Sequence, residues 1–205
     1  MLLGLFWGSV VVAASVNPSY AHRRDYVSAL ASIGASHAWL GVLAIAAFGV
    51  SFVLTASLVR PLSRTAAVTV AAAGAGVVFV AFARIRCVEG AAYCGVGDRS
   101  EIDLQGTRAT LHGVAEGGST LFLLVAMTAV GVALLRRKRR TLGFASLMCA
   151  IATVVTLESI PTDSPGTAQR IFIAVMTLWT GGVAVETLAR RTGKSAATEA
   201  QRQMV

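Results

Sequence analysis

Long runs of uncharged residues limit the fold of this chain more than any motif does. The run from Ala38 to Val59 carries no charge, and neither do residues 65–83 and 117–135. A helix needs about 20 apolar residues to cross the hydrocarbon core of a bilayer, so these runs predict membrane-spanning helices. Hydrophobic residues make up 55% of the 205 residues and charged residues 14%, which is typical of a polytopic membrane protein.

We expect an all-α membrane domain of six transmembrane helices over residues 1–190, followed by a disordered basic tail over residues 191–205. The first run resembles a secretory signal peptide, but it lacks a basic n-region and further spans follow it, so we interpret it as a span. The missing basic flank also leaves open a start codon further upstream, with the first span shortened here. The expected spans cover about residues 1–17, 38–59, 65–85, 111–135, 141–159 and 169–189.

The distribution of basic residues predicts the orientation. "RRKRR" at 136–140 joins the fourth and fifth spans and marks the cytoplasmic side. Alternation then places both termini and the loop with Arg60 and Arg64 inside, in a bacterial cytoplasmic membrane. The net charge of +8 is therefore a signature of topology. We expect membrane lipids as partners and see no reason to propose nucleic acid, whereas protein partners stay unknown.

The outer loop between the third and fourth spans holds two of the three cysteines, Cys87 and Cys94. In an oxidising compartment a disulfide between them would close a small hairpin, and the alternative is two free thiols. No Cys-x-x-Cys motif or nearby histidine accompanies them, so we expect no metal site. Cys149 falls inside the fifth span, where a lone thiol usually fills space.

Polar or charged residues recur at the outer ends of spans two to six. Ionisable groups near lipid are costly and normally face the bundle interior, where they pair. We therefore expect one outward-facing polar pocket, with Glu116 inside the bundle and within reach of Arg84 or Arg170. His112 and Glu116 share a helical face because they are four residues apart. The members of this layer are His37, Arg84, His112, Glu116, Glu158 and Arg170, with Asp25 and Ser28 just above it.

Structural roles compete with a shared pocket, and both interpretations stay open. Arg84 could extend to lipid headgroups, Arg170 could join the last two spans by pairing with Glu158, and His37 beside Trp39 could anchor the interface. The glycines of "LHGVAEGGSTLF" could instead form a close packing face for a neighbouring helix. His-x-x-x-Glu alone is a weak metal motif, and no Gly-x-Ser-x-Gly elbow surrounds Ser28.

Three stretches resemble the bacterial membrane family known as domain of unknown function 998. They are "NPSYAHRRDYVSALASIGASHAW", "TLHGVAEGGSTLFLL" and "GTAQRIFIAVMTLW", in the order that the family shows. The resemblance implies a six-span membrane protein and marks Asp25, Ser28, His112 and Arg170 as motif positions. It implies no activity.

Two classes of function fit these observations. One is an enzyme acting on a lipid or lipid-linked anionic substrate, and the other is a non-catalytic accessory protein that binds a lipid or a partner helix. In the enzyme, Arg84 and Arg170 would hold the headgroup. A transporter is disfavoured because the inner half of spans two to five carries no charge. The cofactor is unknown. Candidate acid or base residues are His112, Glu116 and Asp25, and candidate substrate-binding residues are Ser28, His37, Arg84, Glu158 and Arg170.

Overall fold

The computed structural model describes residues 1–18, 20–87, 102–103, 107–158 and 164–203. The chain forms six α-helices, one 3-10 helix and two very short strands in that part. In chain order they are α1 (Leu2–Ser15), η1 (Val27–Ala31), α2 (Ala38–Val59), α3 (Arg64–Phe82), β1 (Arg86–Cys87), β2 (Ile102–Asp103), α4 (Thr107–Arg136), α5 (Arg140–Glu158) and α6 (Pro165–Gln203).

Five of these helices, α2 to α6, are long and apolar enough to cross a membrane. The sixth, α1, is apolar but has only 14 residues. At 1.5 Å per residue it measures about 21 Å, less than the roughly 30 Å of a hydrocarbon core. The all-helical, polytopic membrane class expected from the sequence is confirmed, with one of its six apolar helices shorter than a full span.

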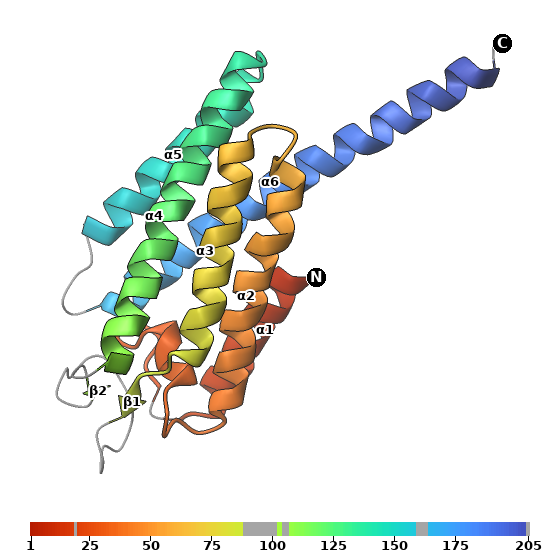
Figure 1. Cartoon of the computed structure of the whole chain (residues 1–205). Helices are drawn as coiled ribbons and strands as arrows, with labels where there is room; N and C mark the ends of the chain where they lie inside the picture. Colours follow the sequence, from red (N-terminus) through yellow and green to blue (C-terminus); the bar gives the residue numbers. More distant parts are fainter. Residues whose placement is uncertain (19, 88–101, 104–106, 159–163, 204–205) are drawn as a thin grey trace.

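Several helix boundaries differ from those expected, including the end of α3 at Phe82 instead of residue 85 and the start of α6 at Pro165 instead of residue 169. α2 covers residues 38–59 as expected, but α4 begins at Thr107, four residues before Leu111, because its first turn is polar and carries no hydropathy signal. α6 continues to Gln203, past the expected end near residue 189, and its end projects away from the bundle (Figure 1). The residues after 189 are rich in Ala, Arg, Lys, Glu and Gln, which favour helix over the disorder that we expected for the tail.

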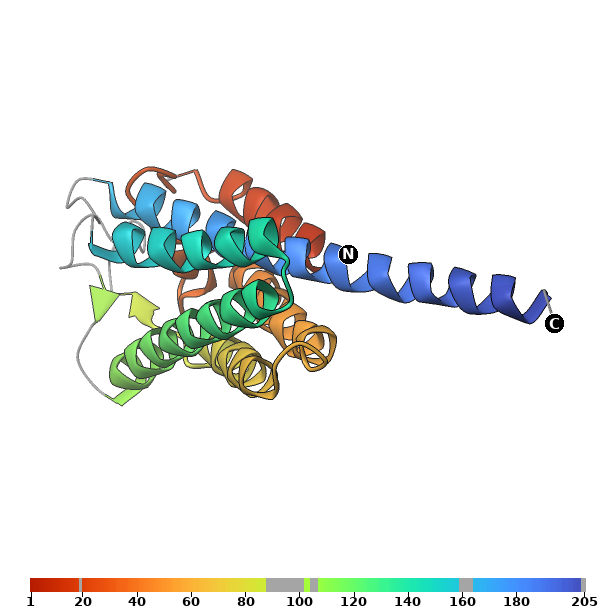
Figure 2. The same ribbon diagram turned by 90° about the horizontal axis from the view of Figure 1, so that it is seen from above.

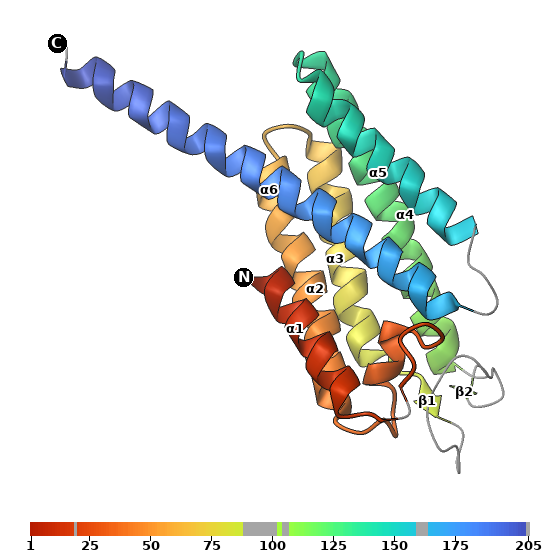
Figure 3. The ribbon, with the colours of Figure 1, turned by 180° about the vertical axis from the view of Figure 1, so that it is seen from behind.

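The helices form two layers. α2, α3 and α4 run side by side in one layer, and α1, α6 and α5 lie in the other, as the view from above shows (Figure 2). From behind, α6 crosses the bundle obliquely between α1 and α5 (Figure 3). Aromatic rings join the layers, since Phe6 of α1 stacks on Phe48 of α2 at 4.6 Å between ring centroids. Met127 of α4 and Met176 of α6 are fully buried in the same core.

A close helix contact in the first layer depends on two glycines, Gly49 of α2 and Gly74 of α3. A Cβ atom on Gly49 would lie 2.7 Å from the Gly74 carbonyl oxygen, and one on Gly74 would lie 2.6 Å from the Gly49 carbonyl oxygen. Helices in lipid associate largely through such close packing, because the hydrophobic effect does not drive them together there. The "AAAGAG" stretch of the third span therefore serves helix packing, as its small residues indicate.

Replacing Gly49 should test this contact. We expect Gly49→Ala to lower the free energy of unfolding by about 1–3 kcal/mol, because the new methyl group forces two backbones apart. Thermal unfolding in detergent, followed by size-exclusion chromatography, measures the effect. Gly182→Ala on α6 is the matched control, since no heavy atom lies within 4 Å of its Cβ position. Equal stability of both variants would contradict the proposed role of the contact.

The two ends of the bundle differ in chemistry. The α2–α3 turn and the α4–α5 turn share one end (Figure 1), where Arg137 Nη2 donates to the Pro61 carbonyl oxygen at 2.7 Å. At the opposite end β1 pairs with β2, with Arg86 opposite Asp103. The loop charges predict the same grouping, with the α2–α3 and α4–α5 turns at one end of the bundle and the loop after α3 at the other. Cys94 lies outside the described residues, so the Cys87–Cys94 disulfide stays a prediction.

The membrane orientation can be measured directly. A reporter fused after Arg140 should be active on the cytoplasmic side, and one fused at Gly97 should be active outside, because basic loops stay inside. Alkaline phosphatase and green fluorescent protein fusions report the two sides. Reversed activity at both positions would overturn the assignment of an outer and an inner end.

Candidate functional site

The polar stretch between α1 and α2 folds into the end of the bundle that carries β1 and β2 (Figure 1). Its 3-10 helix η1 is buried, with Leu30 only 1% exposed. Asn17 holds the start of this segment, since its Nδ2 donates to the carbonyls of Ala13 at 2.7 Å and Ser36 at 3.0 Å. Non-helical backbone at membrane depth needs partners for its peptide groups. The donors and acceptors that supply them define the site.

Arg170 in the first turns of α6 is the main donor to this segment. Its Nη1 donates to the carbonyls of Asp25 at 3.1 Å and Gly166 at 2.8 Å, and also to that of His22. Its Nη2 donates to the Tyr20 hydroxyl, and the guanidinium carbon lies 5.3 Å from the centroid of that ring. Arg170 therefore fixes the stretch between α1 and α2, which we call the linker, to α6.

Tyr20 completes this contact from the linker side. Burial raises the pKa of its phenol to about 12, and this outweighs the opposing effect of Arg170. The phenol stays protonated at physiological pH and can donate towards the carbonyls of Asp25 at 3.4 Å and Tyr26 at 3.3 Å. The hydroxyl thus links the arginine to the linker backbone.

Arg84, just after α3, has a similar role at the other end of η1. Its Nε donates to the Ala31 carbonyl at 2.6 Å and its Nη2 to the Ser32 carbonyl at 3.1 Å. We expected Arg84 or Arg170 to pair with Glu116. Among the described residues neither does, because both guanidiniums donate to backbone carbonyls instead.

Asp25, a candidate acid or base, is also occupied. Its side chain is 0% exposed. The Ala21 amide donates to Oδ2 at 2.6 Å, and Arg24 Nε donates to Oδ1 at 3.2 Å. A carboxylate that accepts backbone and arginine donors in this way closes a turn. This geometry favours a structural role for Asp25.

His112 and Glu116 remain together on α4. His112 Nδ1 lies 2.8 Å from the Ala83 carbonyl oxygen. The other ring nitrogen, Nε2, lies 3.9 Å from Glu116 Oε2 and is buried without a hydrogen-bond partner. The Glu116 side chain is 50% exposed, so it faces the edge of the bundle instead of its interior as expected.

Gln169 of α6 completes the cluster, although the sequence analysis did not single it out. Its Oε1 accepts a hydrogen bond from the Val27 amide at 2.6 Å, which turns its Nε2 towards Glu116 Oε1 at 3.5 Å. The signal was present, because Gln169 precedes Arg170 in the "GTAQR" stretch. We refer to His112, Glu116 and Gln169 as the α4–α6 cluster.

Two hollows meet at Glu116. One is a groove of about 480 Å³ at the edge of the bundle, and the other is a small internal cavity of about 80 Å³ that Ser28 also lines. A Cβ atom on Gly113 or Gly117 would meet no heavy atom within 4 Å. These glycines therefore do not form the close packing face considered above. The groove is lined by Tyr26, Gly113, Glu116, Gly117, Thr120, Leu121, Leu124, Thr156, Leu157, Ala168, Gln169 and Phe172.

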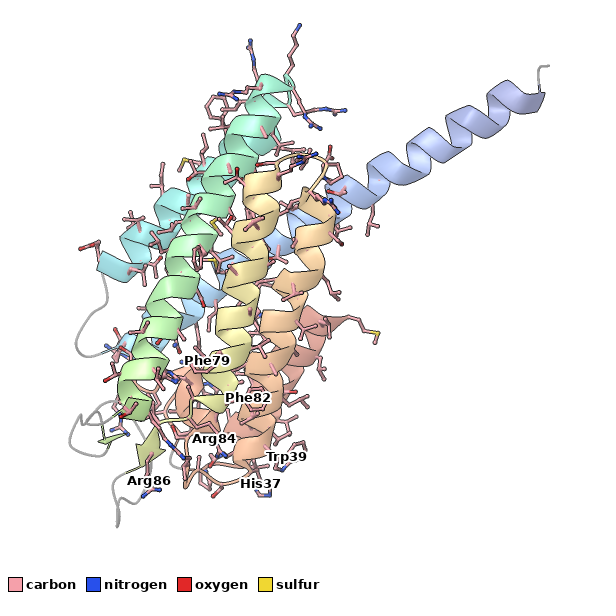
Figure 4. All side chains as sticks on the ribbon, in the orientation of Figure 1. His37, Trp39, Phe79, Phe82, Arg84 and Arg86 are labelled. Atoms are coloured by element: carbon pink, nitrogen blue, oxygen red, sulfur yellow. The ribbon has the colours of Figure 1, made fainter. Side chains whose placement is uncertain are left out.

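The remaining candidates lie apart from this cluster. His37 is exposed, has a φ of 53° and precedes α2. It lies with Trp39, which is 62% exposed, at the same end of the bundle as Arg86, and this fits an interfacial anchor (Figure 4). Glu158 is exposed at the end of α5, and in the described part of the chain it forms no ion pair with Arg170 or another basic residue. The structure therefore brings together only part of the expected layer.

The linker contact predicts a stability effect for Arg170. We expect Arg170→Gln to lower the free energy of unfolding by about 3 kcal/mol, since several linker carbonyls lose a charged donor and Tyr20 loses its partner. Arg170→Lys should retain only part of this stability, because an ammonium group lacks the planar, forked set of donors of a guanidinium. Thermal unfolding measures stability, and trypsin cleavage at the exposed Arg23 and Arg24 reports release of the linker.

The control is Arg86→Gln, which removes an exposed arginine at the same end. It should leave both unfolding and cleavage unchanged. Wild-type cleavage rates in Arg170→Gln would show that the linker does not depend on this side chain.

The comparisons with known proteins identify a family for this chain. The model of the family described as "Protein of unknown function (DUF998)" matches residues 3–186, which is most of the chain. This confirms the resemblance drawn from the three motifs. No curated protein and no solved structure matches the chain.

Proposed function

The chain belongs to the DUF998 family of proteins of unknown function, and we propose that it binds a membrane amphiphile in the groove between α4 and α6. The observation that carries this proposal is the groove itself, which combines an apolar wall with one polar end at Glu116 and Gln169, and His112 lies behind Glu116. We further propose that it does so in the bacterial cytoplasmic membrane, with the polar end on the outer side.

The shape of the groove suits a ligand with a polar head and an apolar chain. Glu116 and Gln169 lie at one level, and Leu121 and Leu124 follow along α4. From Glu116 to Leu124 is about 12 Å at 1.5 Å per residue, so an apolar chain could lie along two turns of the helix. Mostly apolar pockets with a few placed polar groups are the usual form of small-molecule sites.

The charges at the polar end argue against the anionic headgroup that the sequence indicated. Arg84 and Arg170 are bound to backbone carbonyls. Glu116 presents a carboxylate to the groove, and a carboxylate repels an anion at close range. We therefore propose a headgroup that is neutral or cationic.

A binding role accounts for the geometry more fully than catalysis does. Of the three candidate acids and bases, Asp25 is enclosed by its own hydrogen bonds, and only His112 and Glu116 remain beside the groove. Chemical conversion of a bound amphiphile would require a further reacting group. We therefore propose binding alone.

Filling the groove should abolish binding. We expect Gly117→Leu to reduce labelling of residues 113–124 by a photoreactive phospholipid at least tenfold, because the leucine occupies the space beside Glu116. Full-length protein in lipid nanodiscs, irradiated and analysed by peptide mass spectrometry, gives the measurement. A tenfold change corresponds to about 1.4 kcal/mol of binding free energy.

Val114→Phe is the matched control, because it also adds four carbon atoms on α4 but at a position that is 68% exposed and outside the groove. It should label as the wild type does. Undiminished labelling of folded Gly117→Leu would count against the groove as a binding site.

A further inference from the structure

We propose that the headgroup recognised in this groove is a primary ammonium, held between His112 Nε2 and the Glu116 carboxylate. The inference rests on the proposed amphiphile binding and adds the chemical class of the ligand. It starts from one unusual atom, because His112 Nε2 is the one buried side-chain nitrogen or oxygen without a partner in the described residues.

The proton on the His112 ring can be assigned from its partner. A carbonyl oxygen only accepts hydrogen bonds, so the 2.8 Å contact with the Ala83 carbonyl requires the proton on Nδ1. In the neutral ring Nε2 is then an acceptor. The histidine is only 5% exposed, so bulk water does not satisfy this acceptor. Buried polar atoms are nearly always hydrogen-bonded, which indicates that a donor is missing here.

The atom facing Nε2 is also an acceptor. Glu116 Oε2 lies 3.9 Å away, and the two acceptors cannot bond each other while the ring is neutral. A group placed between them must donate at least two protons. The carboxylate adds a negative charge, which favours a cation over a neutral hydroxyl.

The neighbours of Glu116 leave this role open to a ligand. Gln169 is fixed by the Val27 amide and offers Glu116 only a neutral amide donor at 3.5 Å. The nearby cations Arg84 and Arg170 serve the linker carbonyls. Within the described ranges no group of three His, Cys, Asp or Glu residues could hold a metal ion. A primary ammonium has three protons and one positive charge, and so matches both acceptors.

The lipid-facing groove specifies where this ammonium comes from. Gly113 and Gly117 keep the approach to the cluster open, and the apolar wall continues along α4. A membrane aminolipid can place its amine at Glu116 while its chain lies against Leu121 and Leu124. A soluble amine would make only the first of these contacts.

The test compares headgroups in full-length protein. Nanodiscs carry photoreactive phosphatidylethanolamine, phosphatidylcholine or phosphatidylglycerol with identical acyl chains, and labelling of residues 113–124 is quantified. We expect the ethanolamine lipid to label about tenfold more strongly than the choline lipid, whose quaternary nitrogen has no proton to donate, a ratio of about 1.4 kcal/mol. The glycerol lipid should label least.

Two variants assign the preference to the proposed atoms. His112→Asn keeps an amide donor near the Ala83 carbonyl but removes Nε2, and Glu116→Gln removes the charge with little change of shape. Each should bring ethanolamine labelling down to the choline level. The control Thr128→Val, on an exposed turn of α4 outside the groove, should keep the preference.

The outcomes separate the two proposals. Equal labelling by ethanolamine and choline lipids in the wild type would overturn the ammonium but leave amphiphile binding intact. Absence of labelling at residues 113–124 by every lipid would overturn both. Displacement of the label by millimolar soluble ethanolamine alone would support ammonium recognition but assign it to a soluble amine.

A spectroscopic measurement gives an independent check. In ¹⁵N spectra of histidine-labelled protein, the His112 signal, assigned by its loss in His112→Asn, should show an unprotonated Nε2 at neutral pH in choline lipid alone. A doubly protonated ring under these conditions would mean that His112 itself is the cation beside Glu116. That result would overturn the proposed ligand.

Discussion

The carbonyl groups of one non-helical segment determine much of this structure. The linker between α1 and α2 turns back into the bundle, where water is scarce and each peptide oxygen needs a donor. Two arginines from distant parts of the chain supply them, Arg84 after α3 and Arg170 in α6. The same contacts dock α6 against the linker and bring Gln169 to the Val27 amide. The α6 wall of the groove therefore depends on the hydrogen bonds that the linker backbone receives.

This arrangement also sets the electrostatics of the site. Each arginine directed at a carbonyl is unavailable to an acid, so Glu116 has no arginine partner at the edge of the bundle among the described residues. Had the guanidiniums met the carboxylate, the outer pocket would have been a closed ion pair or a site for anions. Whether these two arginines contact carbonyls or Glu116 thus determines which ligands the groove can attract.

The sequence predicted the helices well and the contacts of the polar residues poorly, for a physical reason. Uncharged runs report hydrophobic length, so α2 was predicted with its observed ends. The partner of an arginine is determined by the tertiary structure, and no spacing in the sequence links Arg170 to the linker carbonyls. Glycines show the same limit, because Gly74 meets another helix while Gly117 faces open space. The family resemblance identified the motif positions without showing that Asp25 and Arg170 support the fold, whereas Ser28 lines a small cavity and His112 lies next to Glu116.

The attachment of α5 has a mechanical consequence. It approaches α4 closely where a Cβ atom on Gly143 would lie 3.0 Å from the Gly131 carbonyl oxygen, near the α4–α5 turn. At the other end of α5, Thr156 and Leu157 line the groove. A rotation of α5 about this glycine pair would move the opposite end of the helix most. From Gly143 to Glu158 is about 22 Å, so each degree of such a rotation would shift Glu158 by about 0.4 Å. Rotations of a few degrees there would set the width of the entrance by more than an ångström.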